Sequence, residues 1–151
     1  MIAGDNTWII PEASLYVFGI LQSSMHMAWT RVVSGKIKSD FQYSASIVYN
    51  NFPWPESPTE KQKIAVNNAA QEILDARRKF PNSSLADLYD DNTMPPDLVK
   101  GHHHLNRAVE AAYGKSFRAD AERVSFLFSL FQKYTSLLPT VSTKKARKVP
   151  V

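Results

Sequence analysis

The chain contains no cysteine in its 151 residues, which excludes disulfide bonds, thiolate zinc sites and a cysteine nucleophile. It also lacks the run of about 18 apolar residues that a membrane-spanning helix requires. Its first residues, Met1 to Asn6, include neither the basic nor the apolar segment of a secretory signal peptide. We therefore expect a cytoplasmic protein with no membrane among its partners.

Sequence signatures of catalysis and of cofactor binding are missing as well. All five glycines stand alone in the sequence, whereas a Rossmann-type cofactor loop needs several glycines close together after a strand. No serine lies in a nucleophile-elbow motif. The consecutive histidines His102 to His104 would point about 100° apart on a helix, so they cannot converge on one metal ion. We predict no catalytic residue and no metal site in this chain.

The segment from Asn50 to Pro55 reads Asn-Asn-Phe-Pro-Trp-Pro. It invites comparison with the Asn-Pro-Pro-Tyr/Phe/Trp loop with which amino-methyltransferases hold a flipped base. The two consecutive prolines of that loop are absent here. The sequence favours a proline-rigid linker with buried aromatic residues, and we place a domain boundary at its end.

The charge of the chain is mildly basic, with a net charge of +4 and an isoelectric point near 9.3. This favours polyanionic partners, although many proteins without a nucleic-acid role have the same balance. Part of the excess lies in residues 139–151, which we predict to be a basic flexible tail. For this tail, a solvated segment is favoured over one that contacts phosphate.

The pattern of apolar residues predicts an α+β fold that is mainly α. Helical spacing from Glu12 to Val33 indicates one long buried helix. Helix-start signals near Ser57, Ser84, Pro95 and Ala119 predict a small four-helix bundle after the boundary. The predicted domains are therefore residues 1–56, 57–138 and the tail 139–151. The short strands are expected at Thr7–Pro11, Lys36–Ser44 and Ile47–Tyr49.

Within the second predicted strand, Lys38, Asp40 and Gln42 would project from one face, because side chains alternate along a strand. Lysine can donate to guanine, aspartate can accept from cytosine, and glutamine can contact adenine in the major groove. From spacing alone, a solvent-exposed edge strand with a surface ion pair is the more common explanation. Both interpretations stay open at this point.

Several motifs taken together resemble one family. The resemblance extends from about Trp8 to Leu138, and its most distinctive run is Ile47 to Pro55. These motifs are similar to the carboxy-terminal end of MmeI-like enzymes, which fuse a restriction nuclease and an adenine-N6 DNA methyltransferase in one chain. The motifs are Leu15 to Trp29, Tyr43-Ser44, Ile47 to Pro55, Leu85-Ala-Asp-Leu-Tyr89 and Met94-Pro-Pro-Asp-Leu98.

The resemblance implies the domain organisation and the partners of the chain. Residues 1–56 would end a DNA target-recognition domain, and 57–138 would form a helical domain. The catalytic loop, the cofactor-binding glycines and the nuclease motif lie upstream in the family, so we expect a fragment or a truncated reading frame that binds no cofactor. For the full-length enzyme the resemblance implies S-adenosylmethionine, with Mg²⁺ as an option. The implied partners are double-stranded DNA and the upstream methyltransferase domain, in the same or a separate chain.

In that family the base-reading positions precede the Tyr-Ser and Ile-Val-Tyr-Asn motifs. Carried over by resemblance, they fall on Lys38 and Asp40, with Gln42 close by and Asn6 as a weaker candidate. This agrees with the spacing of the predicted strand. The positions expected to contact the DNA backbone are Lys36 and Arg31.

Two functions remain as alternatives. The first is a non-catalytic segment that recognises DNA sequence and supports the structure of a methyltransferase or restriction enzyme. The second is a purely structural helical module that packs on the methyltransferase domain. Salt-dependent DNA binding separates them, because contacts to phosphate lose affinity steeply as salt rises.

Overall fold

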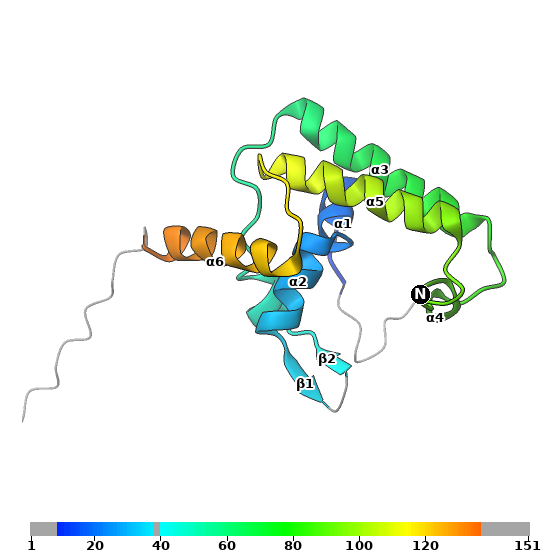
Figure 1. Ribbon diagram of the computed structural model, residues 1–151, viewed down its shortest axis with the longest axis horizontal. Helices are drawn as coiled ribbons and strands as arrows, with labels where there is room; N and C mark the ends of the chain where they lie inside the picture. The colour runs from blue at the N-terminus through cyan, green and yellow to red at the C-terminus, as the bar shows by residue number, and fades with distance from the viewer. Residues whose placement is uncertain (1–8, 38–39, 137–151) are drawn as a thin grey trace, which may run out of the picture.

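The computed structural model describes residues 9–37 and 40–136, and these residues are predominantly helical (Figure 1). Two long helices, α3 and α5, lie side by side; α1 packs against both of them, and α2 packs against α5 and α6. The elements are α1 Leu15–Leu21, α2 Ser24–Val33, β1 Gly35–Ile37, β2 Asp40–Gln42, the π-helix η1 Ala45–Tyr49, α3 Glu60–Arg78, α4 Leu85–Leu88, α5 Pro96–Ala112 and α6 Asp120–Ser136. No helix within the described residues is long and apolar enough to cross a membrane.

The α+β class predicted from the sequence is wrong. Extended pairing in the described residues is confined to one hairpin of two three-residue strands. Residues 47–49, expected as a strand, form part of the π-helix η1. Residues 9–11 are not in a strand, and the rest of the first predicted strand lies outside the described residues.

One long-range and two local hydrogen bonds explain why residues 47–49 are not extended. The β-branched pair Ile47 and Val48 favours a strand locally. In the folded chain the indole nitrogen of Trp29 donates to the Val48 carbonyl at 3.1 Å. The Asn51 side-chain amide also donates to the carbonyls of Ser46 and Ile47, at 2.8 and 3.0 Å. These donors satisfy carbonyls that a sheet partner would otherwise have to satisfy.

The single long helix expected from Glu12 to Val33 is instead two helices, α1 and α2, separated at Gln22 and Ser23. In a continuous helix the Ser24 backbone N–H would donate to the Ile20 carbonyl, four residues earlier. It donates instead to Oδ1 of Asn106 on α5 at 2.8 Å, while the Ser23 hydroxyl donates to the Ile20 carbonyl at 2.6 Å. The break is therefore fixed by a residue 82 positions away in the chain.

The helix starts predicted beyond the linker are close to those observed. Helix α3 begins two residues later than expected from Ser57, with Thr59 as its N-cap and Gln62 completing a capping box. Helix α4 has the predicted N-cap, Ser84, and α5 begins at Pro96. Local capping chemistry therefore decides these boundaries.

The core is shared by helices from both sides of the linker. Helix α1 packs on α3, and α2 packs on α6. The α1–α3 approach is close, because a Cβ atom added at Gly19 would lie 2.8 Å from Cγ1 of Val66. The four helices after the linker thus do not form a bundle with a core of their own. The fully buried apolar residues include Ile20, Met25, Trp29, Val66, Ile73, Leu98, Leu105, Val109 and Leu127.

Candidate nucleic-acid interface

The hairpin formed by β1 and β2 follows directly after α2 and projects from the helical body (Figure 1). Its antiparallel register pairs Gly35 with Gln42, Lys36 with Phe41 and Ile37 with Asp40. The single continuous strand expected at 36–44 is therefore wrong, because the chain reverses between the two strands. The reversal places Lys36 on the strand opposite Asp40 and Gln42.

The candidate base-reading residues lie at or near this hairpin. Asp40 and Gln42 are alternate positions of β2, and the Gln42 side chain is exposed. Lys38 and Asn6 lie outside the described residues. Of the two candidates for backbone contact, Lys36 is in β1 and Arg31 is an exposed residue in the last turn of α2. The fold thus brings Lys36, Asp40 and Gln42 together at one projecting element.

The base of the hairpin is anchored to α2 by an aromatic cluster. Tyr43, directly after β2, places its hydroxyl 3.1 Å from Nε2 of the buried His26. The His26 ring in turn meets the Phe52 ring edge-on, with centroids 4.7 Å apart. A hairpin of two short strands has little stability of its own. Its position therefore depends on this cluster.

The linker from Asn50 to Pro55 connects this anchor to the long helices. Phe52 and Pro53 are buried, and the Tyr113 hydroxyl of α5 donates to the Pro53 carbonyl at 2.8 Å. The Tyr134 hydroxyl of α6 donates to the Trp54 carbonyl at 3.1 Å. Burial raises the pKa of Tyr113, which keeps this donor protonated. Of the two aromatic residues predicted to be buried in this segment, Phe52 is buried and Trp54 is half-buried, and the contacts of both are structural.

The histidine of this anchor makes the stability of the fold dependent on pH. Burial lowers the pKa of His26 to about 4, against about 6.5 in an unfolded chain. Between these values the unfolded state binds a proton that the folded state does not, so stability decreases as pH falls. We expect the free energy of unfolding to drop by on the order of 2 kcal/mol between about pH 7 and pH 5.

Urea unfolding of the chain at both pH values would measure this drop. The matched variant His26→Gln has no imidazole to titrate, so its stability should change less over the same interval. An equal pH dependence in the two proteins would show that other groups cause the loss.

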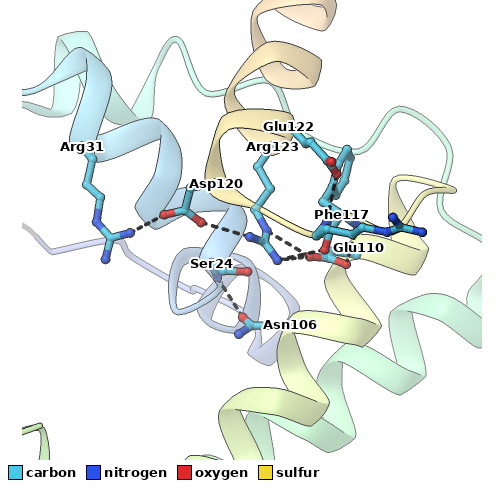
Figure 2. Close-up of polar contacts among 9 residues, drawn as sticks. Ser24, Arg31, Asn106, Glu110, Phe117, Asp120, Glu122 and Arg123 are labelled. Atoms are coloured by element: carbon cyan, nitrogen blue, oxygen red, sulfur yellow. Dashed lines mark hydrogen bonds and ion pairs between the residues drawn. The ribbon is translucent and has the colours of Figure 1, made fainter.

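A polar network connects α2, α5 and α6 beside the anchor (Figure 2). Arg31 pairs with Asp120 at 2.5 Å, and Asp120 also accepts from Arg123 at 3.0 Å. Arg123 donates from two nitrogens to Oε1 of the buried Glu110, at 2.7 and 3.0 Å. The other carboxylate oxygen of Glu110 accepts from the Phe117 backbone N–H at 3.1 Å. Arg31, a candidate for DNA contact, is thus already part of an exposed ion pair.

Sequence reasoning did not identify Asn106, Glu110 and Arg123 as partners. Their only sequence signal is that each is a polar residue beside buried positions of an amphipathic helix. That signal does not say which partner each one meets, because the partners lie on different helices. The ion pair of Arg123 with Glu110 and the bond from Ser24 to Asn106 are properties of the tertiary structure.

The histidines of α5 have structural partners. The Tyr89 hydroxyl lies 2.7 Å from Nε2 of His102 and accepts from Arg77 at 2.5 Å, so it donates its proton to His102. Burial lowers the pKa of His102, consistent with a neutral ring that accepts. His104 lies 2.8 Å from a carboxylate oxygen of Glu72 on α3. Within residues 9–37 and 40–136 no group of three or more His, Asp or Glu side chains could hold a metal ion.

Comparison with known sequences identifies two matching family profiles. Residues 1–56 match the target recognition domain of MmeI, and residues 58–139 match the C-terminal domain of MmeI. DNA methyltransferase A of Bacillus subtilis (strain 168) is 43% identical over 135 residues, which is 89% of this chain and 15% of the relative.

Comparison with solved structures gives a consistent match. A structure of the Type IIL restriction–modification enzyme MmeI in complex with DNA matches with a TM-score of 0.81 at 50% sequence identity. The match covers 85% of this chain and 17% of that chain. The chain thus spans less than a fifth of the length of either relative.

Proposed function

The chain belongs to the MmeI family, and from this membership we propose that it is a DNA sequence-recognition and structural segment of a larger restriction–modification methyltransferase. The observation that carries the proposal is the match of residues 1–56 to a target recognition domain, because this range contains the projecting hairpin. The proposed partner is double-stranded DNA, and MmeI itself was solved in complex with DNA.

In this proposal the hairpin reads bases and the helices hold it in place. Lys38 and Asp40 recognise one G·C pair, with Gln42 and Asn6 as further base contacts. Each good bidentate contact would discriminate against a wrong base by about 1–3 kcal/mol. Lys36 and Arg31 would contact the DNA backbone and hold the register.

Catalysis is proposed to reside elsewhere in the full-length enzyme. The described residues offer neither a glycine-rich cofactor loop nor a cluster of metal ligands. S-adenosylmethionine, and any Mg²⁺, would therefore be bound by the parts of the enzyme outside this segment. The methyltransferase domain is the proposed protein partner.

As a second candidate function, the helices α3 to α6 would have a purely structural role. The core that they share with α1 and α2 favours this role. These helices contribute most of the buried apolar residues, among them Val66, Ile73, Leu105 and Leu127. Under this alternative the helices would pack on the methyltransferase domain and leave DNA affinity unchanged.

Exchanging the two proposed base-reading residues tests the assignment. In a full-length enzyme that carries this segment, the double variant Lys38→Asp/Asp40→Lys should recognise a different base pair at one position of its site. The physical reason is that the donor and the acceptor trade places on the hairpin. Sequencing of the methylated positions in DNA from cells that express each enzyme would measure the change.

A matched control makes the same exchange away from the hairpin. Lys79 and Asp97 form an exposed ion pair at 2.5 Å, so Lys79→Asp/Asp97→Lys keeps the composition and leaves the hairpin intact. This control should methylate the original sequence. If the hairpin variant also methylates the original sequence, Lys38 and Asp40 do not read bases.

A further inference from the structure

A groove runs along α5 where it meets the N-terminal ends of α2 and α6. Its volume is about 1070 Å³, and its lining includes Lys100, His103 and Arg107 from α5, together with Ser24 and Arg123. Its lining includes no residue of the hairpin strands β1 and β2. Neither the family resemblance nor the hairpin explains why this groove is basic.

The lysine and arginine of the groove, together with the His103 ring, are accessible to an external anion. Lys100, His103 and Arg107 are exposed, and none of them forms an ion pair within residues 9–37 and 40–136. The carboxylate in the lining belongs to Glu110, which is buried and already accepts from Arg123 and the Phe117 N–H. The groove therefore carries uncompensated positive charge.

Asn106 adds an oriented donor to the groove. Its Oδ1 atom accepts from the Ser24 N–H at 2.8 Å, which fixes the orientation of the amide (Figure 2). Asn106 is one of the residues that line the groove, and its amide nitrogen has no acceptor among the described residues. Cations and amide donors without a free carboxylate are the chemistry that binds phosphate oxygens.

The groove continues toward the hairpin. A second hollow of about 410 Å³ shares Ser24, Met94 and Asn106 with it and extends to Arg31. Arg31 lies in the last turn of α2, four residues before Gly35, where the hairpin begins. The two hollows together form one track that leads from Lys100 and Arg107 on α5 to Arg31 at the base of the hairpin. The positive charge of Lys100 and Arg107 lies at its α5 end, whereas Arg31 at the other end is paired with Asp120.

We propose that this track binds the phosphodiester backbone of the DNA duplex that the hairpin reads, so that the helical domain contributes to affinity as well as to structure. The inference rests on the proposed function. DNA is favoured over an acidic protein segment because the track is continuous with the hairpin. Contacts of this kind hold the register of the duplex and are independent of its sequence.

Salt dependence of DNA binding tests the proposal. In the double variant Lys100→Gln/Arg107→Gln, the slope of log affinity against log salt should become shallower by about 2, because two phosphate contacts are lost. Affinity at low salt should fall roughly tenfold or more, equally for duplexes of different sequence. Fluorescence anisotropy with a labelled duplex between about 50 and 200 mM NaCl would measure both quantities.

The control is the double variant Lys63→Gln/Arg78→Gln, which removes the same charge from α3. Arg78 is exposed and Lys63 is half-buried. Both are already paired, Lys63 with Glu60 at 2.7 Å and Arg78 with Asp75 at 2.9 Å, and neither lines the groove. Its salt slope should stay close to that of the unchanged chain.

Other outcomes would overturn the proposal. Equal slopes in the two double variants would mean that the groove does not touch DNA and would favour an acidic protein segment as its occupant. Absence of DNA binding by the unchanged chain at about 50 mM salt would also reject it. Failure here is distinguishable from failure of the hairpin assignment, which is measured as the methylated sequence in a full-length enzyme.

Discussion

Replacing Trp29 with alanine is expected to lower the free energy of unfolding by about 3–5 kcal/mol. Trp29 is 2% exposed and its ring packs against Phe128 and Phe131 of α6, with centroids 5.1 and 5.8 Å away. The substitution removes these contacts, leaves a cavity and frees the Val48 carbonyl from its hydrogen bond. Urea unfolding followed by circular dichroism would measure the loss.

The variant Trp29→Phe separates the two parts of this effect. It keeps much of the ring contact with α6 and removes the indole donor to Val48. We expect a smaller loss of about 1–3 kcal/mol, the cost of leaving one buried carbonyl unsatisfied. Equal losses in the two variants would mean that the hydrogen bond to Val48, and not packing, dominates at this position.

Replacement of Trp29 should also affect DNA sequence discrimination, because of where Trp29 lies. It lies on α2, which leads into the hairpin, and it contacts Phe52 of the linker, with ring centroids 6.4 Å apart. A base-reading residue must be held to a fraction of an ångström. Loosening of this cluster should therefore weaken sequence discrimination before the chain unfolds.

Replacing Glu110 with alanine is expected to lower the free energy of unfolding by about 3 kcal/mol. The side chains of Glu110 and Arg123 are 7% and 14% exposed, so removal of the carboxylate leaves a nearly buried guanidinium without its main partner. The Phe117 N–H loses its acceptor as well. The loss of stability should be near the lower end of the range expected when one partner of a buried ion pair is removed, because Arg123 still donates to Asp120.

A double-mutant cycle checks this explanation. Arg123→Leu alone should also be costly, because it leaves the Glu110 carboxylate buried and unpaired. The double variant Glu110→Ala/Arg123→Leu should lose much less than the sum of the two single losses. If the losses simply add, the pair does not act as a unit and the stability comes from packing alone.

The exposed ion pair between Arg31 and Asp120 should behave differently. Its side chains are 52% and 45% exposed, so the pair contributes at most about 1 kcal/mol. This low value suits Arg31 to an exchange of partners, in which a phosphate replaces the Asp120 carboxylate. In the proposed exchange, the buried pair of Glu110 and Arg123 would keep α5 and α6 joined.

Residues near each other in the sequence determined the caps of the long helices. Ser84 and Thr59 cap α4 and α3 through side chains three residues away, Asp87 and Gln62. Such interactions need no tertiary partner, so the sequence correctly predicts the cap Ser84, but it places the cap of α3 two residues early, at Ser57 instead of Thr59. The sequence alone also shows that the glycines of a cofactor loop are absent and that the segment from Asn50 to Pro55 is rich in proline and aromatic residues. These are properties of the residues themselves and need no knowledge of the fold.

The candidate site was predicted only in part. The sequence placed Asp40 and Gln42 in extended structure, and the structure agrees. It did not predict that Lys36 lies on the opposite strand, because reversal of a hairpin depends on pairing between strands. The basic groove on α5 was missed entirely, since its lining comes from α2, α5 and α6.

Three features of the fold depend on tertiary contacts. Asn106 on α5 accepts a hydrogen bond from the Ser24 N–H. This bond divides a stretch with continuous helical periodicity into α1 and α2. The Trp29 indole donates to the Val48 carbonyl, and the segment Ala45–Tyr49, which has high strand propensity, forms a π-helix. The packing of α1 on α3 and α2 on α6 merges two sequence segments into one core. Local propensities differ by less than about 1 kcal/mol per residue, so one buried hydrogen bond or packed side chain from a distant residue outweighs them.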